Sequence, residues 1–136
     1  MSSPSIVTSW LQAAGRFPLL TAEQEIHLAH QIQRGMAEGA TPQQQRIGAR
    51  AKQKMIQSNL KLIVAVAKKY TITINTCAAI NLEDLLQEGC IGLNRAAEKF
   101  DPCAGYKFST YAYWLISQSI TRLIEQTKST VRVPSQ

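Results

Sequence analysis

Apolar residues recur every three or four positions along most of this chain, which is the spacing of amphipathic helices. Dipeptides typical of hairpin turns, such as Asn-Gly, are missing, and no pair of alternating strands is recognisable. The pattern therefore predicts an all-α fold, a compact bundle of about five helices.

The first two helices are bounded by residues that commonly start and stop helices. The first is predicted from Pro4 to about Ala14. The second opens at Thr21, which is spaced to form a capping box with Gln24, so that the two side chains bond to unpaired backbone amides. Its expected apolar side consists of Leu28, Ile32 and Met36.

A long third helix is predicted from about Pro42 to Thr71. Its second half is apolar around much of its circumference, through Leu60, Leu62, Ile63, Val64, Val66 and Ala67. β-Branched residues follow, but no partner strand is apparent, so residues 71–81 are predicted to form a long loop.

The fourth helix is expected to begin at Asn81, a residue that caps helix N-termini well. Glu83 follows in the first turn, where the helix dipole favours negative charge. One side of this helix is apolar at three- and four-residue steps and is expected to face the core. The opposite side carries Asp84, Gln87, Glu88 and Asn94.

The last predicted helix covers residues 109–127 and separates two sets of side chains. Its expected core side is Ala112, Leu115, Ile116, Ser119, Ile120 and Leu123. A second side consists of Tyr111, Trp114, Gln118 and Arg122. The two aromatic residues of this second side are predicted to be partly exposed, beside groups suited to stack unpaired bases and bind phosphates. The alternative is that the rings are half-buried and pack on the turn at residues 101–105.

The chain has a net charge of +6, from fifteen Lys and Arg against nine Asp and Glu. No acid lies between Glu38 and Glu83, and the cations there recur at helical steps: Arg46, Arg50, Lys54, Lys61 and Lys68. A basic helix side suits a polyanion such as nucleic acid or an acidic membrane. An ordinary solvated side explains the same pattern.

Other kinds of chemistry find little support in the residues. Cys77, Cys90 and Cys103 are too far apart for a zinc knuckle or a redox dithiol, and His27 and His30 have no ligand cluster around them, so we expect no metal or other cofactor. No nucleophile–base pair or phosphate-binding glycine loop is visible, so an enzyme is not expected. No signal peptide or apolar run of ~20 residues is present, so we expect a cytoplasmic protein without a membrane partner.

Four long stretches resemble, in order, the most conserved domain of bacterial RNA polymerase sigma factors of the housekeeping-like class. They are NLKLIVAVAKKY, LEDLLQEGCIGLNRAAEKFD, GYKFSTYAYWLISQSITR and VRVP. The short helical segment that precedes this domain in the family is similar to WLQAAGRFPLLTAEQEIHLAHQI. The resemblance implies a helical segment at residues 1–38, then a domain at residues 39–136 that binds core polymerase and recognises the promoter minus-ten element, packed as one unit.

The resemblance also implies a function: a subunit without enzymatic activity that binds core RNA polymerase, directs it to promoters and helps to open the minus-ten element. The implied partners are a coiled coil of the largest polymerase subunit and promoter DNA, especially its non-template strand. An anti-sigma factor is a further candidate partner. By motif position, the side that docks on the coiled coil contains Asp84, Gln87, Glu88 and Asn94.

The same motifs imply three groups of DNA-binding residues. Around a flipped non-template adenine and the edge of the opened region lie Tyr106, Lys107, Phe108, Thr110, Tyr111 and Trp114. Tyr111 would stack on the adenine, Trp114 would fill the upstream edge, and Lys107 would bind the backbone. The duplex just upstream would meet Gln118, Thr121 and Arg122. A pocket for a downstream flipped thymine would contain Asn59, Leu62 and Ser109.

The chain departs from the family pattern at several positions. Leu115 stands where housekeeping members usually carry a second tryptophan, and Ser117 where they usually carry arginine. Cys103 and Ala104 replace basic residues, and the connector at residues 71–81 is longer than usual. Because fewer cations weaken DNA binding and the lost indole weakens the wedge at the bubble edge, these departures indicate an alternative or non-essential sigma factor with weaker or altered promoter melting.

The family continues beyond VRVP into further DNA-binding domains, so we expect this chain to be a fragment of a longer protein. Two other interpretations stay open at this point. One is a helical module that binds single-stranded nucleic acid regardless of sequence. The other is a helical adaptor that uses the side with Asp84, Gln87 and Glu88 to bind proteins only.

Overall fold

The structure is a computed structural model that describes residues 3–71 and 80–131, with side chains over residues 6–71 and 80–127. In these residues the chain forms α-helices joined by turns, and no strand is present, which confirms the all-α prediction. The described helices are α1 (Ser3–Gly15), α2 (Ala22–Met36), α3 (Pro42–Gln57), α4 (Leu60–Lys69), α6 (Leu82–Lys99) and α7 (Phe108–Val131). The predicted loop at 71–81 lies largely outside the described residues.

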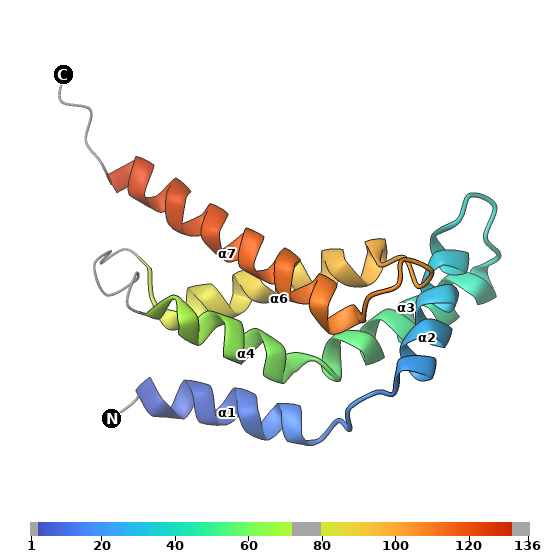
Figure 1. Cartoon of the computed structure of the whole chain (residues 1–136), viewed down its shortest axis with the longest axis horizontal. Coiled ribbons are helices and arrows are strands. Elements are labelled where there is room, and N and C mark those ends of the chain that lie inside the picture. Colours follow the sequence, from blue (N-terminus) through green and yellow to red (C-terminus); the bar gives the residue numbers. More distant parts are fainter. Residues whose placement is uncertain (1–2, 72–79, 132–136) are drawn as a thin grey trace.

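The helices are arranged around α4 and α6 (Figure 1). The last helix, α7, packs across α6 and also contacts α4, while α1 lies along another side of α4. The hairpin of α2 and α3 forms one end of the molecule, and both of its helices contact α6. None of the helices in the described part of the chain is long and apolar enough to span a membrane.

Three helices start at capping boxes. The box predicted at Thr21 is confirmed: the Thr21 hydroxyl accepts a hydrogen bond from the Gln24 amide at 3.1 Å, and the Gln24 side chain accepts one from the Thr21 amide at 2.9 Å. Asn81 and Asp84 pair in the same way, at 2.9 and 3.1 Å. A third box joins Thr41 to Gln44. Each box satisfies two amides that the helix itself leaves unpaired.

The prediction of one long third helix was wrong, because the helix is interrupted at Ser58 and Asn59. The Ser58 hydroxyl donates to the backbone carbonyl of Lys54 at 2.9 Å, and the side-chain amide of Asn59 donates to the backbone carbonyl of Met55 at 2.7 Å. Such short polar side chains compete with the backbone for helical hydrogen bonds and favour a break. Continuous apolar spacing on both sides of these residues concealed the break.

Met36 was wrongly expected on the apolar side of α2, since its side chain is 56% exposed. The two helices of the hairpin meet instead at Gly35 and Gly48. A Cβ atom on Gly35 would lie 2.8 Å from the carbonyl oxygen of Gln44 and 3.0 Å from the Cα of Gly48. The backbones approach so closely that no large side chain enters the contact, and Met36, the last residue of the helix, is left in solvent.

The core lies where α4, α6 and α7 meet. Its largest fully buried side chains are Met55, Ile63, Leu85, Leu86, Leu93, Phe108, Ile116 and Ile120, with Ile32 from α2. The predicted core side of α7 is confirmed for Ala112, Ile116, Ser119 and Ile120, whereas Leu115 and Leu123 are half-buried. Because α7 is fixed on this side, its opposite side has a defined position on the surface.

Candidate nucleic-acid interface

The turn between α6 and α7 is shaped by local bonds. The Asp101 carboxylate accepts a hydrogen bond from the Cys103 amide at 2.9 Å, and Gly105 has a φ of 90°, a conformation that glycine adopts readily. Two side chains of α2 hold this turn from the other side. Gln33 donates to the carbonyl of Phe100 at 3.1 Å, and the Glu25 carboxylate accepts a hydrogen bond from the Phe108 amide. Helix α2 therefore helps to position the start of α7.

Burial raises the pKa of Glu25 above its usual value, because a partly buried carboxylate loses hydration. The hydrogen bond from the Phe108 amide and the positive charge of Lys107 act in the opposite direction. Glu25 and Ile26 also line a small cavity of about 240 Å³ with Tyr106 and Lys107. The sequence pattern does not distinguish Glu25, since acids in the first turn of a helix, here Glu23 and Glu25, are usually ordinary partners of the helix dipole.

Aromatic rings form a connected cluster from the core to the surface. Phe100 and Phe108 meet edge to face, with ring centroids 5.3 Å apart, and Phe108 is completely buried. Tyr111 lies 6.1 Å from Phe100 and stacks on Tyr106 at 5.9 Å with an interplanar angle of 23°. Trp114 lies 6.0 Å from Tyr106. We call these five residues the aromatic cluster.

Exposure changes sharply across the aromatic cluster. Trp114 is 56% exposed and Tyr106 is 39% exposed, while Tyr111 is half-buried between Tyr106 and the core. The prediction that Tyr111 and Trp114 are partly exposed is confirmed. Phe108 was expected to be near DNA, but its buried ring has no free face for a base. It supports the ring of Phe100, on which Tyr111 rests.

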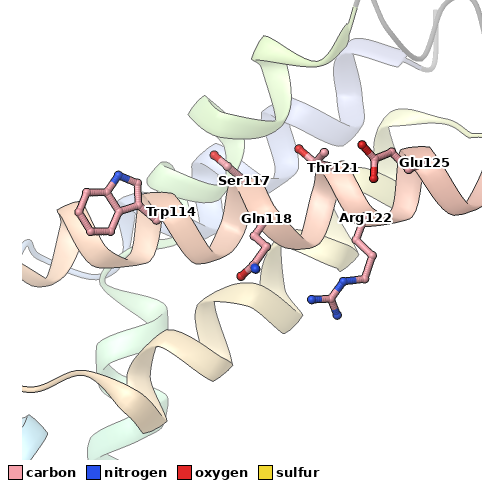
Figure 2. A pocket seen from close by; sticks show the side chains of 6 residues that line it. All are labelled: Trp114, Ser117, Gln118, Thr121, Arg122 and Glu125. Atoms are coloured by element: carbon pink, nitrogen blue, oxygen red, sulfur yellow. The ribbon is translucent and has the colours of Figure 1, made fainter.

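A shallow groove of about 460 Å³ continues along α7 from the aromatic cluster. Its lining residues are Trp114, Ser117, Gln118, Thr121, Arg122 and Glu125. Figure 2 shows two rows: Ser117, Thr121 and Glu125 project from one side of the helix, and Gln118 and Arg122 from the other. The structure thus brings the three predicted duplex-contacting residues together with Trp114. Glu125 is a member of this groove that the sequence analysis missed.

The end of α4 lies beside the first of these rows. The ammonium of Lys69 donates to the Tyr113 hydroxyl at 2.5 Å and lies 4.5 Å from the centre of its ring. About two turns further along α7, the Thr121 hydroxyl is 3.4 Å from the Tyr70 hydroxyl. Lys69 therefore brings a positive charge to the side of α7 on which Ser117 lies.

The predicted thymine-pocket residues occupy the starts of two helices that pack together, α4 and α7. Asn59 and Leu62 are half-buried, and Ser109 is exposed. The side-chain NH2 group of Asn59 already donates to the Met55 carbonyl, which leaves the Oδ1 atom of Asn59 to accept a hydrogen bond.

The polar side of α6 is present at the surface. Gln87 is exposed, whereas Asp84, Glu88 and Asn94 are half-buried, and one carboxylate oxygen of Asp84 caps the helix. Ile91 lies one turn after Gln87 and is 52% exposed. An exposed isoleucine among polar groups gives this side an apolar centre of the kind found at protein interfaces.

The basic side predicted along one helix is divided between α3 and α4. Its members are all exposed: Arg46, Arg50 and Lys54 on α3, and Lys61 and Lys68 on α4. Within the described side chains the one ion pair joins Lys52 to Glu98, at 2.8 Å. The exposed cations therefore keep their charge available to a polyanion.

The sequence of the chain matches models of two known protein families. The sequence model of Sigma-70 region 2 matches residues 55–130, more than half of the chain. The chain belongs to the sigma-70 family. A second model, Sigma-70 factor, region 1.2, matches residues 6–38, which include most of α1 and all of α2. The resemblance found in the sequence is thereby confirmed.

Relatives in the sigma-70 family include several cyanobacterial proteins. The chain is 47% identical to "RNA polymerase sigma factor SigA4" of Synechococcus elongatus over 94% of its own length and 42% of that protein. It is 42% identical to "RNA polymerase sigma factor SigA2" of the same organism, over 97% and 48%. With "RNA polymerase sigma-B factor" of Nostoc sp. it shares 44% identity, over 94% and 46%. The chain spans less than half the length of each of these three proteins.

Proposed function

We propose that this chain is the part of a sigma factor that binds core RNA polymerase and recognises and melts the promoter minus-ten element. It acts as a binding subunit without catalytic activity, in the cytoplasm where polymerase and promoter meet. The observation that carries the proposal is the aromatic cluster: rings that are exposed at one end and anchored in the core at the other, directly beside the groove of α7.

The aromatic cluster is suited to hold an unpaired base. The ring of Tyr111 lies between Phe100 and Tyr106, so a base that stacks on Tyr111 would take the place of the exposed Tyr106 ring while Phe100 supports Tyr111 from the core. Stacking of one base on such a ring contributes ~1–3 kcal/mol and requires only a flat, accessible face. Exposed Lys107 and Thr110 lie nearby in the chain for the backbone of the same strand. We assign the flipped non-template adenine to Tyr111 and the edge of the opened region to Trp114.

The groove of α7 is suited to the duplex upstream of that base. Gln can bond an adenine edge and Arg a guanine edge, while Thr accepts or donates. Gln118, Thr121 and Arg122 therefore form the proposed duplex contact. Asn59, Leu62 and Ser109 are the proposed residues for the downstream thymine.

The polar side of α6 is the proposed docking site for the coiled coil of the largest polymerase subunit. Its core-binding residues are Asp84, Gln87, Glu88 and Asn94. Because α6 crosses α7, docking on α6 would hold the aromatic cluster in a defined position relative to the polymerase. An anti-sigma factor would compete for one of these two surfaces.

Weaker melting is the proposed consequence of the departures at Leu115 and Ser117. Leu115 is half-buried against the core and provides no indole at the edge of the opened region, and Ser117 provides no charge. Leu115→Trp combined with Ser117→Arg should increase the permanganate reactivity of thymines in the opened region. Unchanged reactivity would count against this interpretation.

The proposal is tested with core polymerase and fork-junction DNA that contains or lacks the minus-ten adenine. The chain should co-purify with core, and the complex should prefer the adenine-containing probe. Tyr111→Ala should weaken that binding by ~5- to 150-fold, the equivalent of one lost base stack. Tyr111→Phe keeps the ring and should retain most of the preference.

A matched pair of charge reversals tests the docking side. Glu88→Lys should reduce co-purification with core, whereas Glu38→Lys, an exposed acid in the turn after α2, should not. Equal binding of mixed-sequence single strands without polymerase would instead indicate a sequence-tolerant single-strand-binding module, which the exposed cations of α3 and α4 also suit. An adaptor that binds proteins only would be indicated if Tyr111→Ala left promoter opening unchanged.

A further inference from the structure

Glu125 is an unexpected residue in a groove that is proposed to face DNA. The groove is otherwise lined by an indole, hydroxyls, an amide and a guanidinium, all of which favour nucleic acid. A carboxylate repels the phosphate backbone and lowers affinity for any DNA sequence. Glu125 follows Ser117 and Thr121 along one side of α7 at steps of one helical turn (Figure 2). A favourable contact with the DNA would offset the repulsion that its charge causes.

The carboxylate of Glu125 is free to bond to a ligand. The ion pair among the described side chains joins Lys52 to Glu98, and Figure 2 shows the Arg122 guanidinium on the other side of α7. Glu125 is exposed, so both oxygens can accept hydrogen bonds. It therefore enters the groove as an unpaired acceptor at the end farthest from Trp114.

An acceptor-only group discriminates among bases in the major groove. Guanine and thymine present acceptors at the positions that a carboxylate would reach, and the thymine methyl adds bulk. Adenine presents an amino donor, but its N7 acceptor lies beside it and repels the carboxylate. Cytosine presents its N4 amino group without a neighbouring acceptor, which makes it the base that Glu accepts from. Arg122 would favour guanine by the converse argument.

The spacing along α7 locates the base pair. Gln118 and Glu125 are seven residues apart, which is ~10 Å along a helix. Base pairs are spaced by ~3.4 Å, so a helix that follows the groove would place Glu125 about three base pairs beyond the pair met by Gln118. Since Tyr111 marks the opened side, that pair lies farther upstream in the duplex.

We propose that Glu125 is a specificity residue that selects a cytosine, in one strand of the duplex, about three base pairs upstream of the pair contacted by Gln118. This inference rests on the proposed function, because it requires the groove of α7 to lie along promoter DNA. It adds a base preference that the aromatic cluster and Gln118 do not account for.

The test uses the chain bound to core polymerase and a set of fork-junction probes. In these probes the base pairs at the second, third and fourth positions upstream of the Gln118 contact are varied one at a time, each through all four bases. The wild-type complex should prefer cytosine in one strand by ~5- to 10-fold at one of these pairs. Glu125→Ala should abolish the preference, and Glu125→Gln should shift it toward adenine, which an amide bonds bidentately. Glu38→Gln removes one exposed acid in the turn between α2 and α3, a turn that lies far from the C-terminal half of α7 (Figure 1), and should leave the preference unchanged.

Two results would overturn the inference. One is the absence of any base preference in the wild-type complex at these pairs. The other is an equal gain in affinity for all probes on Glu125→Ala or Glu125→Gln, which would show that the carboxylate only repels phosphates. Each probe is also made without the minus-ten adenine. If binding depends on that adenine while base preference upstream is missing, only this inference fails; if adenine dependence is missing too, the proposed function fails with it.

Discussion

Substitution of Gly92 by alanine tests whether the crossing of α6 and α7 fixes the position of the aromatic cluster. A Cβ atom at Gly92 would lie 2.6 Å from the carbonyl oxygen of Leu115 and 2.8 Å from the Cα of Ile116. Favourable separations between such atoms are about 3.5–4.0 Å, so α7 would have to move away by on the order of 1 Å. Both obstacles are backbone atoms, and no rotation of a side chain relieves the contact.

Two energies of opposite sign decide the outcome. Alanine favours a helix over glycine by ~1 kcal/mol. Overpacking in a well-packed core costs about 1–3 kcal/mol and occasionally more, and backbone against backbone belongs at the upper end. We therefore expect Gly92→Ala to lower the free energy of unfolding by ~1–2 kcal/mol, which corresponds to a fall in Tm of about 3–10 °C for a chain of this size.

The assay is thermal unfolding of wild type and variant, followed by far-UV circular dichroism. Gly15→Ala is the matched control, because a Cβ atom at Gly15, at the end of α1, would meet nothing within 4 Å. Gly15→Ala should leave Tm unchanged or raise it slightly. If Gly92→Ala unfolds at the wild-type temperature or above, the backbone contact does not set the separation of α6 and α7, and the reasoning is refuted.

Three further predictions concern individual groups. Because the pKa of Glu25 is raised in the folded protein, the folded state binds more protons than the unfolded state at pH values just above the usual carboxyl pKa, so the free energy of unfolding should fall as pH rises through that window. Glu25→Gln should remove this part of the stability profile, and an unchanged profile would contradict the prediction. Exposed Cys103 should react with a thiol reagent before half-buried Cys90, whose pKa is raised by burial, as mass spectrometry of the labelled chain would show; faster labelling of Cys90 would contradict the structure. Tyr113→Phe keeps the ring under the Lys69 ammonium but removes the hydrogen bond, whereas Lys69→Ala removes the charge. Only Lys69→Ala should reduce the slope of log affinity against log salt concentration for fork-junction binding by the complex with core, by ~0.7–0.9. Arg34→Ala, at the α2–α3 hairpin, should leave that slope unchanged.

Local features of the fold could be predicted well from the sequence. The capping box at Thr21 and the N-cap at Asn81 were predicted, because each depends on residues within three positions of one another. The break at Ser58 and Asn59 is also local, yet it was concealed, because the apolar spacing continues on both sides and is the stronger pattern. Competition between polar side chains and the helix backbone becomes apparent only when the hydrogen bonds to Lys54 and Met55 are seen.

The candidate site shows the same division. The wheel of α7 predicted that Tyr111, Trp114, Gln118 and Arg122 share one side, and the structure confirms the partial exposure of the two aromatic residues. Glu125 continues the groove but was not singled out. An acid on a helix surface is common, and only its position beside Thr121 and the absence of an ion pair among the described side chains distinguish it.

Residue patterns along the chain are enough to predict the all-α class, most helix ends, the polar side of α6 and, through the longer motifs, the family. Only packing between helices shows that Phe108 is buried while Tyr106, two residues earlier, is exposed, and that Glu25 of α2 bonds to the start of α7. The physical reason is that apolar spacing reports which side of a helix avoids water but not which neighbour covers it. That neighbour is set by contacts between segments far apart in the chain, such as Gly92 against Leu115.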